Sequence, residues 1–187
     1  MIAALTLAAG PVIGPARAGA LEDALAAYAK GDYATALAIW QPLAASGDPD
    51  AEFWLGALYD LGRGVPQSLD TASRLYGKAA QQGQANAQFN LGQMYETGQG
   101  VPAEYRWAAA AAWYRRAAEQ GYRAAQGNLG ALYATGRGVQ RNYIEAYKWL
   151  ALAGITANVE FVARQMSAQE IDEAKRLVRD WQPRKER

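Results

Sequence analysis

The side chains that could carry chemistry in this chain are hydroxyls and carboxylates, because the sequence contains neither cysteine nor histidine. Thiolate nucleophiles, imidazole bases and zinc sites with Cys or His ligands are therefore excluded. The four serines are Ser46, Ser68, Ser73 and Ser167. None of them lies in a GxSxG elbow or an SxxK motif, and the paired carboxylates Asp48 and Asp50 stand where they would cap a helix. We expect no catalytic residue, no metal site and no cofactor.

A glycine pair followed by valine is the other motif that could hold a ligand, and it occurs three times. LGALYDLGRGV at residues 55–65 returns as LGQMYETGQGV at 91–101 and as LGALYATGRGV at 129–139. A dinucleotide-binding loop needs a preceding strand, whereas each of these copies follows an apolar pattern with helical spacing. The copies are 36 and then 38 residues apart, a period typical of stacked helical repeats.

Each repeat is predicted to consist of two helices joined by a tight turn. Ala51, Leu55 and Tyr59 recur at i, i+4 and i+8 in the first helix, and Ala72 and Tyr76 represent the same kind of face in the second. The glycines are expected either to end the first helices in the left-handed conformation or to allow close helix approach. A further, shorter copy begins near residue 21. We therefore expect an all-α fold, a solenoid of about four helix-turn-helix repeats.

The two ends of the chain differ from the repeats. Residues 1–18 are mostly apolar, contain two Gly-Pro breaks and end in Ala16-Arg17-Ala18, the small-x-small pattern of a secretory cleavage site. We expect a secretory signal peptide over 1–18, a helical repeat array over 19–154, and C-terminal capping helices with a basic tail over 155–187. The protein is then predicted to be periplasmic or secreted, without a stable membrane span after signal cleavage. Ser167 and Glu170 form a capping box that would begin the closing helix.

The pattern LGxxYxxGxGV, followed by Ala, an aromatic residue, Ala-Ala and Gly on a 36-residue cycle, resembles the Sel1-like repeat (SLR) family, relatives of the tetratricopeptide repeats. The resemblance covers about residues 21–154, and the ending MSAQEIDEAKRLVRDW is similar to the way bacterial members often finish. It implies a right-handed α-α solenoid that holds other proteins. Some secreted, cysteine-rich relatives are described as β-lactam-binding or β-lactam-hydrolysing proteins, but this chain has none of their cysteines.

Tetratricopeptide relatives bind peptides on the concave side, which is lined by the first helix of each pair. The resemblance transfers that surface to this chain and predicts a groove that accepts an apolar or basic partner segment. The predicted partner-binding residues are Phe53, Asp60, Phe89, Gln93 and Glu96. The alternative is that the two phenylalanines only fill the seams between successive repeats.

We thus expect a non-catalytic protein-protein interaction scaffold or adaptor of the bacterial cell envelope. The formal net charge of +1 offers no overall attraction for nucleic acid or an anionic membrane, and a solenoid of this length can work as a monomer. An envelope glycan-binding or peptidoglycan-binding module is the alternative, with Phe89, Asn90 and Gln93 as the cluster that such a ligand would use. A β-lactam-related hydrolase is the third alternative.

Overall fold

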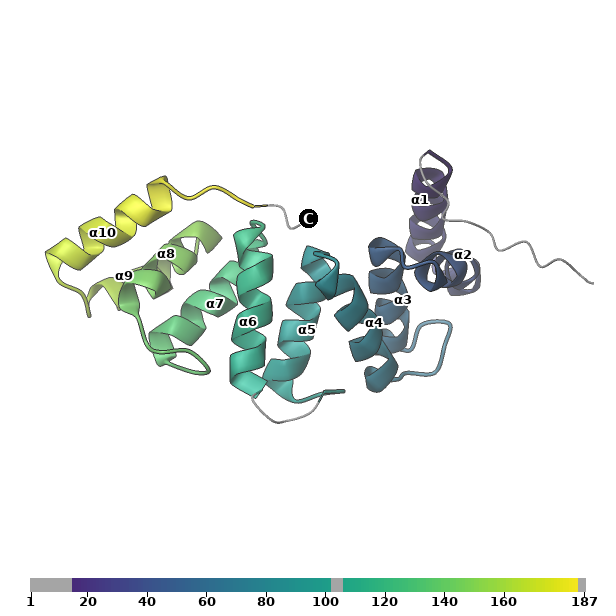
Figure 1. Ribbon diagram of the computed structural model, residues 1–187, viewed down its shortest axis with the longest axis horizontal. Helices are drawn as coiled ribbons and strands as arrows, with labels where there is room; N and C mark the ends of the chain where they lie inside the picture. Colours follow the sequence, from purple (N-terminus) through teal and green to yellow (C-terminus); the bar gives the residue numbers. More distant parts are fainter. Residues whose placement is uncertain (1–14, 102–105, 185–187) are drawn as a thin grey trace, which may run out of the picture.

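The computed structural model describes residues 15–101 and 106–184, and all its regular elements in these ranges are helices (Figure 1). The helices are α1 (Pro15–Ala29), α2 (Tyr33–Ala45), α3 (Pro49–Leu61), α4 (Leu69–Gln81), α5 (Ala85–Thr97), α6 (Arg106–Glu119), α7 (Arg123–Thr135), α8 (Tyr143–Ala153), α9 (Thr156–Ala163) and α10 (Ala168–Arg179). Helices α1 to α9 follow one another along the longest axis and pack mainly on their neighbours in sequence, whereas α10 packs on α8. This arrangement confirms the predicted all-α solenoid of stacked helix pairs.

Side-chain caps and left-handed glycines set several of the helix bounds. Ser68 and Asn142 each accept a hydrogen bond from the backbone N–H three residues further on, at the starts of α4 and α8. The first helices α3, α5 and α7 each end at a glycine with positive φ, namely Gly62, Gly98 and Gly136. This confirms the role predicted for these glycines, because a residue with a Cβ would be strained there by about 1–2 kcal/mol.

The second glycine of each turn also contacts the preceding repeat. Gly64, Gly100 and Gly138 have φ values of 71°, 65° and 68°. A Cβ on Gly138 would stand 2.2 Å from the carbonyl carbon of Trp107, and a Cβ on Gly100 would stand 2.5 Å from the carbonyl oxygen of Leu69. Each of these turns therefore rests on the start of the second helix of the repeat before it, which the sequence pattern alone does not reveal.

The core consists of small residues and larger apolar side chains, and one large residue recurs at the same position of every repeat. Alanines on both helices of each pair are buried, which brings the backbones close together. The large residues at the repeated position are Trp40, Tyr76, Tyr114 and Leu150, each at most 1 % exposed. The glycine inside each first helix faces this residue, and a Cβ on Gly92 would stand 2.7 Å from the ring of Tyr114. The close approach expected for these inner glycines is therefore confirmed.

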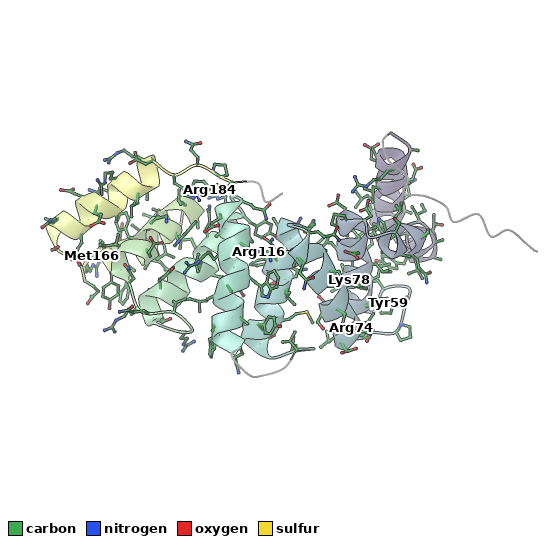
Figure 2. All side chains as sticks on the ribbon, viewed as in Figure 1. Tyr59, Arg74, Lys78, Arg116, Met166 and Arg184 are labelled. Carbon is green, nitrogen blue, oxygen red and sulfur yellow. The ribbon has the colours of Figure 1, made fainter. Side chains whose placement is uncertain are left out.

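Helices α9 and α10 close the array on α8. Ser167 and Glu170 form the predicted capping box at the start of α10. After α10, the ring of Trp181 packs edge-on against Trp149 of α8, with centroids 6.4 Å apart. Met166, between α9 and α10, packs against the same hydrophobic cluster (Figure 2). Apolar side chains that follow α9 and α10 therefore cover the hydrophobic core at this end of the solenoid.

The N-terminal segment is described only in part. Residues 1–14 of the predicted signal lie outside the described residues, and Ala16-Arg17-Ala18 lies in the first turn of α1. The guanidinium of Arg17 forms ion pairs with Asp48 and Asp50 at the start of α3. Signal cleavage stays a prediction, and it would remove these two ion pairs. Within residues 15–101 and 106–184, no helix is both long enough and apolar enough to cross a membrane.

A buried polar position recurs in the first helices. Gln88 of α5 and Gln126 of α7 are 0 % and 2 % exposed, and each side-chain amide donates to a carbonyl of the preceding second helix, at 3.0 and 3.2 Å. Glu52 occupies this position in α3, is 3 % exposed, and accepts a hydrogen bond from Gln82. Burial raises the pKa of Glu52, while the charge of Lys78 opposes this shift. Glu52 therefore has a buried carboxyl group at the position where the other two repeats have the amides of Gln88 and Gln126.

Glu52→Gln should stabilise the protein at neutral pH by about 1 kcal/mol, because a neutral amide replaces a buried charge and can donate to the carbonyl of Ala44, eight residues earlier. The pKa of Glu52 is raised in the folded state. Ionisation of Glu52 therefore lowers the free energy of unfolding. This loss is absent below the unfolded pKa of about 4.3 and grows as the pH rises toward the folded pKa. Urea unfolding followed by circular dichroism should show the variant to be more stable at neutral pH, with a difference that shrinks toward pH 4. A variant that is less stable at neutral pH would contradict this prediction.

Candidate partner-binding surface

A chain of hydrogen bonds connects the first helices of neighbouring repeats through a buried tyrosine. The hydroxyl of Tyr76 on α4 donates to the carboxylate of Asp60 on α3 at 3.2 Å. The side chain of Asn90 on α5 bonds the same hydroxyl, so one tyrosine joins three helices. The equivalent set one repeat later is Glu96 on α5, Tyr114 on α6 and Asn128 on α7.

Both tyrosine hydroxyls are buried beside a carboxylate. Burial, followed by the nearby carboxylate, raises the pKa of Tyr76 and of Tyr114 far above the ordinary value for tyrosine. The chain of bonds does not continue into the first repeat, where Trp40 takes the place of the tyrosine, stacks on Trp54 at 5.5 Å and leaves its Nε1 without a partner among the described residues. It does not continue into the last repeat either, where Leu150 occupies the position. The two central junctions are therefore the polar ones.

A hollow of about 230 Å³ lies beside the first of these two junctions, between α3 and α5. Its lining residues are Asp60, Asn90, Gln93, Met94, Thr97 and Gln99. Asp60 is half-buried and Gln93 is exposed, whereas the hydroxyl of Thr97 donates to a carbonyl of its own helix at 2.9 Å. The structure thus brings together two of the five predicted partner-binding residues, Asp60 and Gln93.

The two predicted phenylalanines lie mainly in the seams between helices. Phe53 is 8 % exposed and packs against the rings of Trp54 and Tyr76, with centroids 5.0 and 5.8 Å away. Phe89 is half-buried and lies 5.8 and 5.0 Å from two tyrosine rings of α6 and the turn before α7. These positions favour the alternative in which both rings fill seams, and a contact between Phe89 and a partner stays a prediction.

Glu96, the fifth predicted residue, is already engaged within the protein. Its carboxylate accepts a hydrogen bond from the hydroxyl of Tyr114, and its backbone carbonyl accepts one from Nη2 of Arg106 at 2.7 Å. Glu96 does not line the hollow that contains Asp60 and Gln93. Its part in partner binding is therefore untested, while its part in joining α5 to α6 is clear from the geometry.

Asn128 was not among the predicted residues, and Asn90 was predicted only as part of the cluster for the alternative glycan ligand. A signal for them is present in the sequence, because Asn90 and Asn128 precede the Leu-Gly pair of the second and third copies of the motif. Trp54 stands at this position in the first copy. In the first repeat, Trp54 stacks on Trp40 of the preceding helix. In the next repeat, asparagine replaces Trp54 and tyrosine replaces Trp40, and the two side chains form a hydrogen bond.

The chemistry that the hollow offers is binding. A carboxylate oxygen accepts hydrogen bonds, and a side-chain amide both donates and accepts them, so Asp60 and Gln93 can together hold an ammonium group, a guanidinium group or a peptide N–H. The described residues contain no group of three or more acidic side chains placed to hold a metal ion. The surface is thus suited to a polar or basic segment of another molecule.

Comparison with known proteins gives three consecutive matches to the family model described as Sel1 repeat, at residues 49–84, 85–122 and 123–154. The crystal structure of a Sel1 repeat protein from Oxalobacter formigenes is 38% identical and matches with a TM-score of 0.67 over 71% of this chain and 54% of that one. The crystal structure of c5321, a protective antigen present in uropathogenic Escherichia coli strains displaying an SLR fold, is 26% identical, with a TM-score of 0.59 over 88% of this chain and 45% of that one. This chain thus matches about half the length of either structure. No curated protein matches it.

Proposed function

The chain belongs to the Sel1 repeat family, whose members are generally scaffolds for protein interactions, and on this premise we propose that it holds a partner polypeptide on its first helices. The observation that carries the proposal is that half-buried Asp60 and exposed Gln93 line the same hollow between α3 and α5. A basic residue or an exposed main-chain segment of the partner fits this pair. The protein acts in this proposal as a non-catalytic adaptor.

The cell envelope is the proposed place of action, in the periplasm or outside the cell. The support is the apolar stretch of residues 1–18 with its small-x-small ending, which is typical of a secretory signal. The absence of cysteine is compatible with an oxidising compartment, because no unpaired thiol is present to react there.

Gln93→Arg should abolish partner capture while the protein stays folded. Gln93 is exposed, so the change adds a cation beside Asp60 without disturbing the core, and that cation would repel a basic partner segment and fill the hollow. The measurement is in vivo crosslinking of the full-length protein in its native envelope, followed by mass spectrometry. We expect a protein that is captured by the native chain and lost with the variant.

The matched control is Ala131→Arg, at the equivalent exposed position of α7, which does not line the hollow. This variant should keep the captured partner. Equal capture by the native chain and by the Gln93 variant would show that the hollow is not the binding site. Co-sedimentation of the purified protein with isolated cell wall, without any captured protein, would instead support a glycan-binding function and overturn the proposal.

A further inference from the structure

A groove on the second helices offers a binding surface that is separate from the hollow between α3 and α5. A cavity of about 600 Å³ lies between α6, α7 and α8, and it adjoins a cavity of about 300 Å³ with which it shares Glu119, Lys148 and Trp149. The second cavity extends to residues 180–184, where the backbone N–H of Arg184 donates to the carbonyl of Glu119 at 2.8 Å. We call these two adjoining cavities the second-helix groove.

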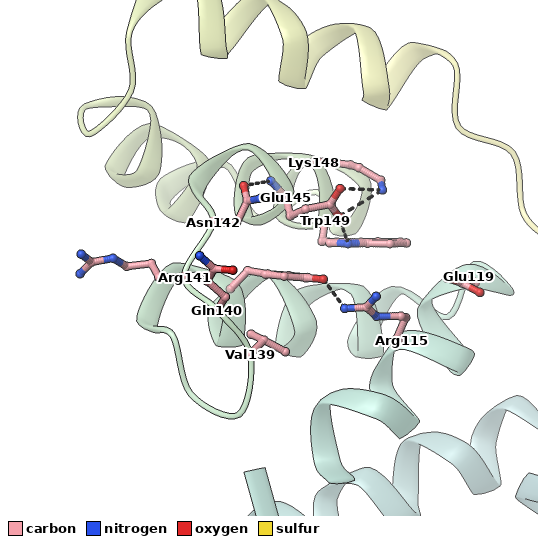
Figure 3. Close-up of a pocket in the computed structure, with 10 residues that line it drawn as sticks. Arg115, Glu119, Val139, Gln140, Arg141, Asn142, Glu145, Lys148 and Trp149 are labelled. Atoms are coloured by element: carbon pink, nitrogen blue, oxygen red, sulfur yellow. Dashed lines mark hydrogen bonds and ion pairs between the residues drawn. The ribbon is translucent and has the colours of Figure 1, made fainter. Parts of the chain in front are cut away.

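Cationic donors remain available in this groove after its internal bonds are made (Figure 3). The guanidinium of Arg115 donates to the hydroxyl of Tyr133, which uses one of the five N–H groups that arginine carries. The ammonium of Lys148 lies 3.2 Å from the carboxylate of Glu145 and 4.3 Å from the centre of the Trp149 ring. Glu145 also accepts the indole N–H of Trp149 at 2.8 Å, so its oxygens are largely satisfied within the protein.

The charges of the array are divided between its two sets of helices. The first helices α3, α5 and α7 carry Asp50, Glu52, Asp60, Glu96 and Arg123. The second helices α4, α6 and α8 carry Arg74, Lys78, Arg106, Arg115, Arg116 and Lys148 together with Asp70, Glu119 and Glu145. Arg74, Lys78, Arg116 and Arg184 can be followed in Figure 2. The first helices are therefore mainly acidic and the second helices mainly basic, although the net charge of the whole chain is only +1.

The repeat frame does not require the charged residues of the groove. Arg115 on α6 corresponds to Gly77 on α4, and Lys148 on α8 corresponds to Ala112 on α6. Arg74 on α4 also stands at the position of Lys148. Because an uncharged residue occupies each of the two positions in at least one other repeat, the packing of the repeats does not need the cations of Arg115 and Lys148. Arg141 and Arg184 also line the two cavities, so the groove carries four cations against the three carboxylates of Glu119, Glu145 and Asp180.

We propose that the second-helix groove binds an acidic, extended segment of a second protein. Charge complementarity favours such a segment, because carboxylates of the ligand would pair with Arg115 and Lys148, and its main chain would use the amides of Gln140 and Asn142. The chain is then an adaptor with two surfaces of opposite charge, and it can join a basic partner on its first helices to an acidic partner on its second helices.

Titration of the full-length protein with a fluorescein-labelled octapeptide of alternating Glu and Gly tests this inference by fluorescence anisotropy at about 50 mM salt. We expect saturable binding that Arg115→Gln and Lys148→Gln each weaken by about tenfold. Arg74→Gln is the matched control, since Arg74 is an exposed cation of a second helix outside the groove, and it should change the affinity less than twofold. Equal losses for all three variants, or no binding to the native protein, would overturn the proposal.

A second measurement on the native protein avoids dependence on the folding of the variants. Addition of the acidic peptide should shift the indole N–H resonances of Trp149 and Trp181, which line the groove, and leave those of Trp40 and Trp54 unchanged. Shifts at Trp40 and Trp54 alone, or tighter binding of a single-stranded oligonucleotide of equal charge at the same indoles, would contradict the assignment to an acidic peptide. Because Gln93 lies outside the groove, a negative capture experiment with the Gln93 variant would not affect this titration.

Discussion

Gly138→Ala should lower the free energy of unfolding by about 2–5 kcal/mol. The left-handed backbone at this glycine would strain a residue with a Cβ by about 1–2 kcal/mol. The added Cβ would also stand 2.2 Å from the carbonyl carbon of Trp107, where overpacking costs about 1–3 kcal/mol more. The obstacle is backbone at the start of α6, so no side chain can rotate away to make room. Urea unfolding monitored by far-ultraviolet circular dichroism measures the difference.

Gly77→Ala is the matched control for this experiment. Gly77 lies inside α4, and a Cβ there would meet nothing within 4 Å. Alanine favours the helix over glycine by about 1 kcal/mol, so this variant should be as stable as the native protein or slightly more stable. A loss of stability in the Gly77 variant that equals the loss in the Gly138 variant would show that the contact between the turn and the preceding repeat is not the cause.

Phe53→Ala should lower the free energy of unfolding by about 3–5 kcal/mol, as expected for the truncation of a buried aromatic side chain. Phe53 is 8 % exposed and fills the seam beside Trp54 and Tyr76, so alanine would leave a cavity between α3 and α4. Thermal and urea unfolding of the purified variant measure the loss.

Phe161→Ala is the comparison for this truncation, because Phe161 on α9 is 62% exposed. Its loss should change the free energy of unfolding by less than about 0.5 kcal/mol. A Phe53 variant with native stability that fails to capture a partner would show that Phe53 contacts the partner and does not fill a seam. The experiment therefore decides between the two interpretations of the predicted phenylalanines.

Much of the fold could be predicted because the repeat makes each local signal appear three times. Glycines at 62, 98 and 136 end helices in the left-handed conformation wherever they occur, and the alternation of alanine with one large side chain specifies which face of each helix is buried. Such signals depend only on residues that are close in sequence. They can therefore be recognised without knowledge of the distances between repeats.

The contacts between repeats could not be predicted in the same way. The approach of Gly100 to Leu69 and the hydrogen bonds of Tyr76 with Asp60 and Asn90 depend on how one helix pair is rotated against the next. The spacing of residues within one helix does not determine how that helix pair is rotated against the next. For the same reason, the sequence does not indicate that the charged residues of α6 and α8 share a groove.

The candidate site was predicted in part because family positions give the location of a residue but not its packing. Asp60 and Gln93 lie in the second halves of their helices and line the hollow, whereas Phe53 lies in the first turns of α3 and is buried. Glu96 lies next to the hollow but turns toward Tyr114. A large apolar residue at a family binding position is thus a weaker indication of contact with a partner than a polar one.

The glycine turns give the array a direction. Gly64, Gly100 and Gly138 each rest on the repeat that precedes them, so every unit brings with it the means of attachment to the unit before. A gene duplication that inserts one whole unit would therefore supply a complete new junction without further substitutions. Solenoids built in this way can lengthen during evolution one unit at a time, and the surfaces they present can diversify after the frame is already secure.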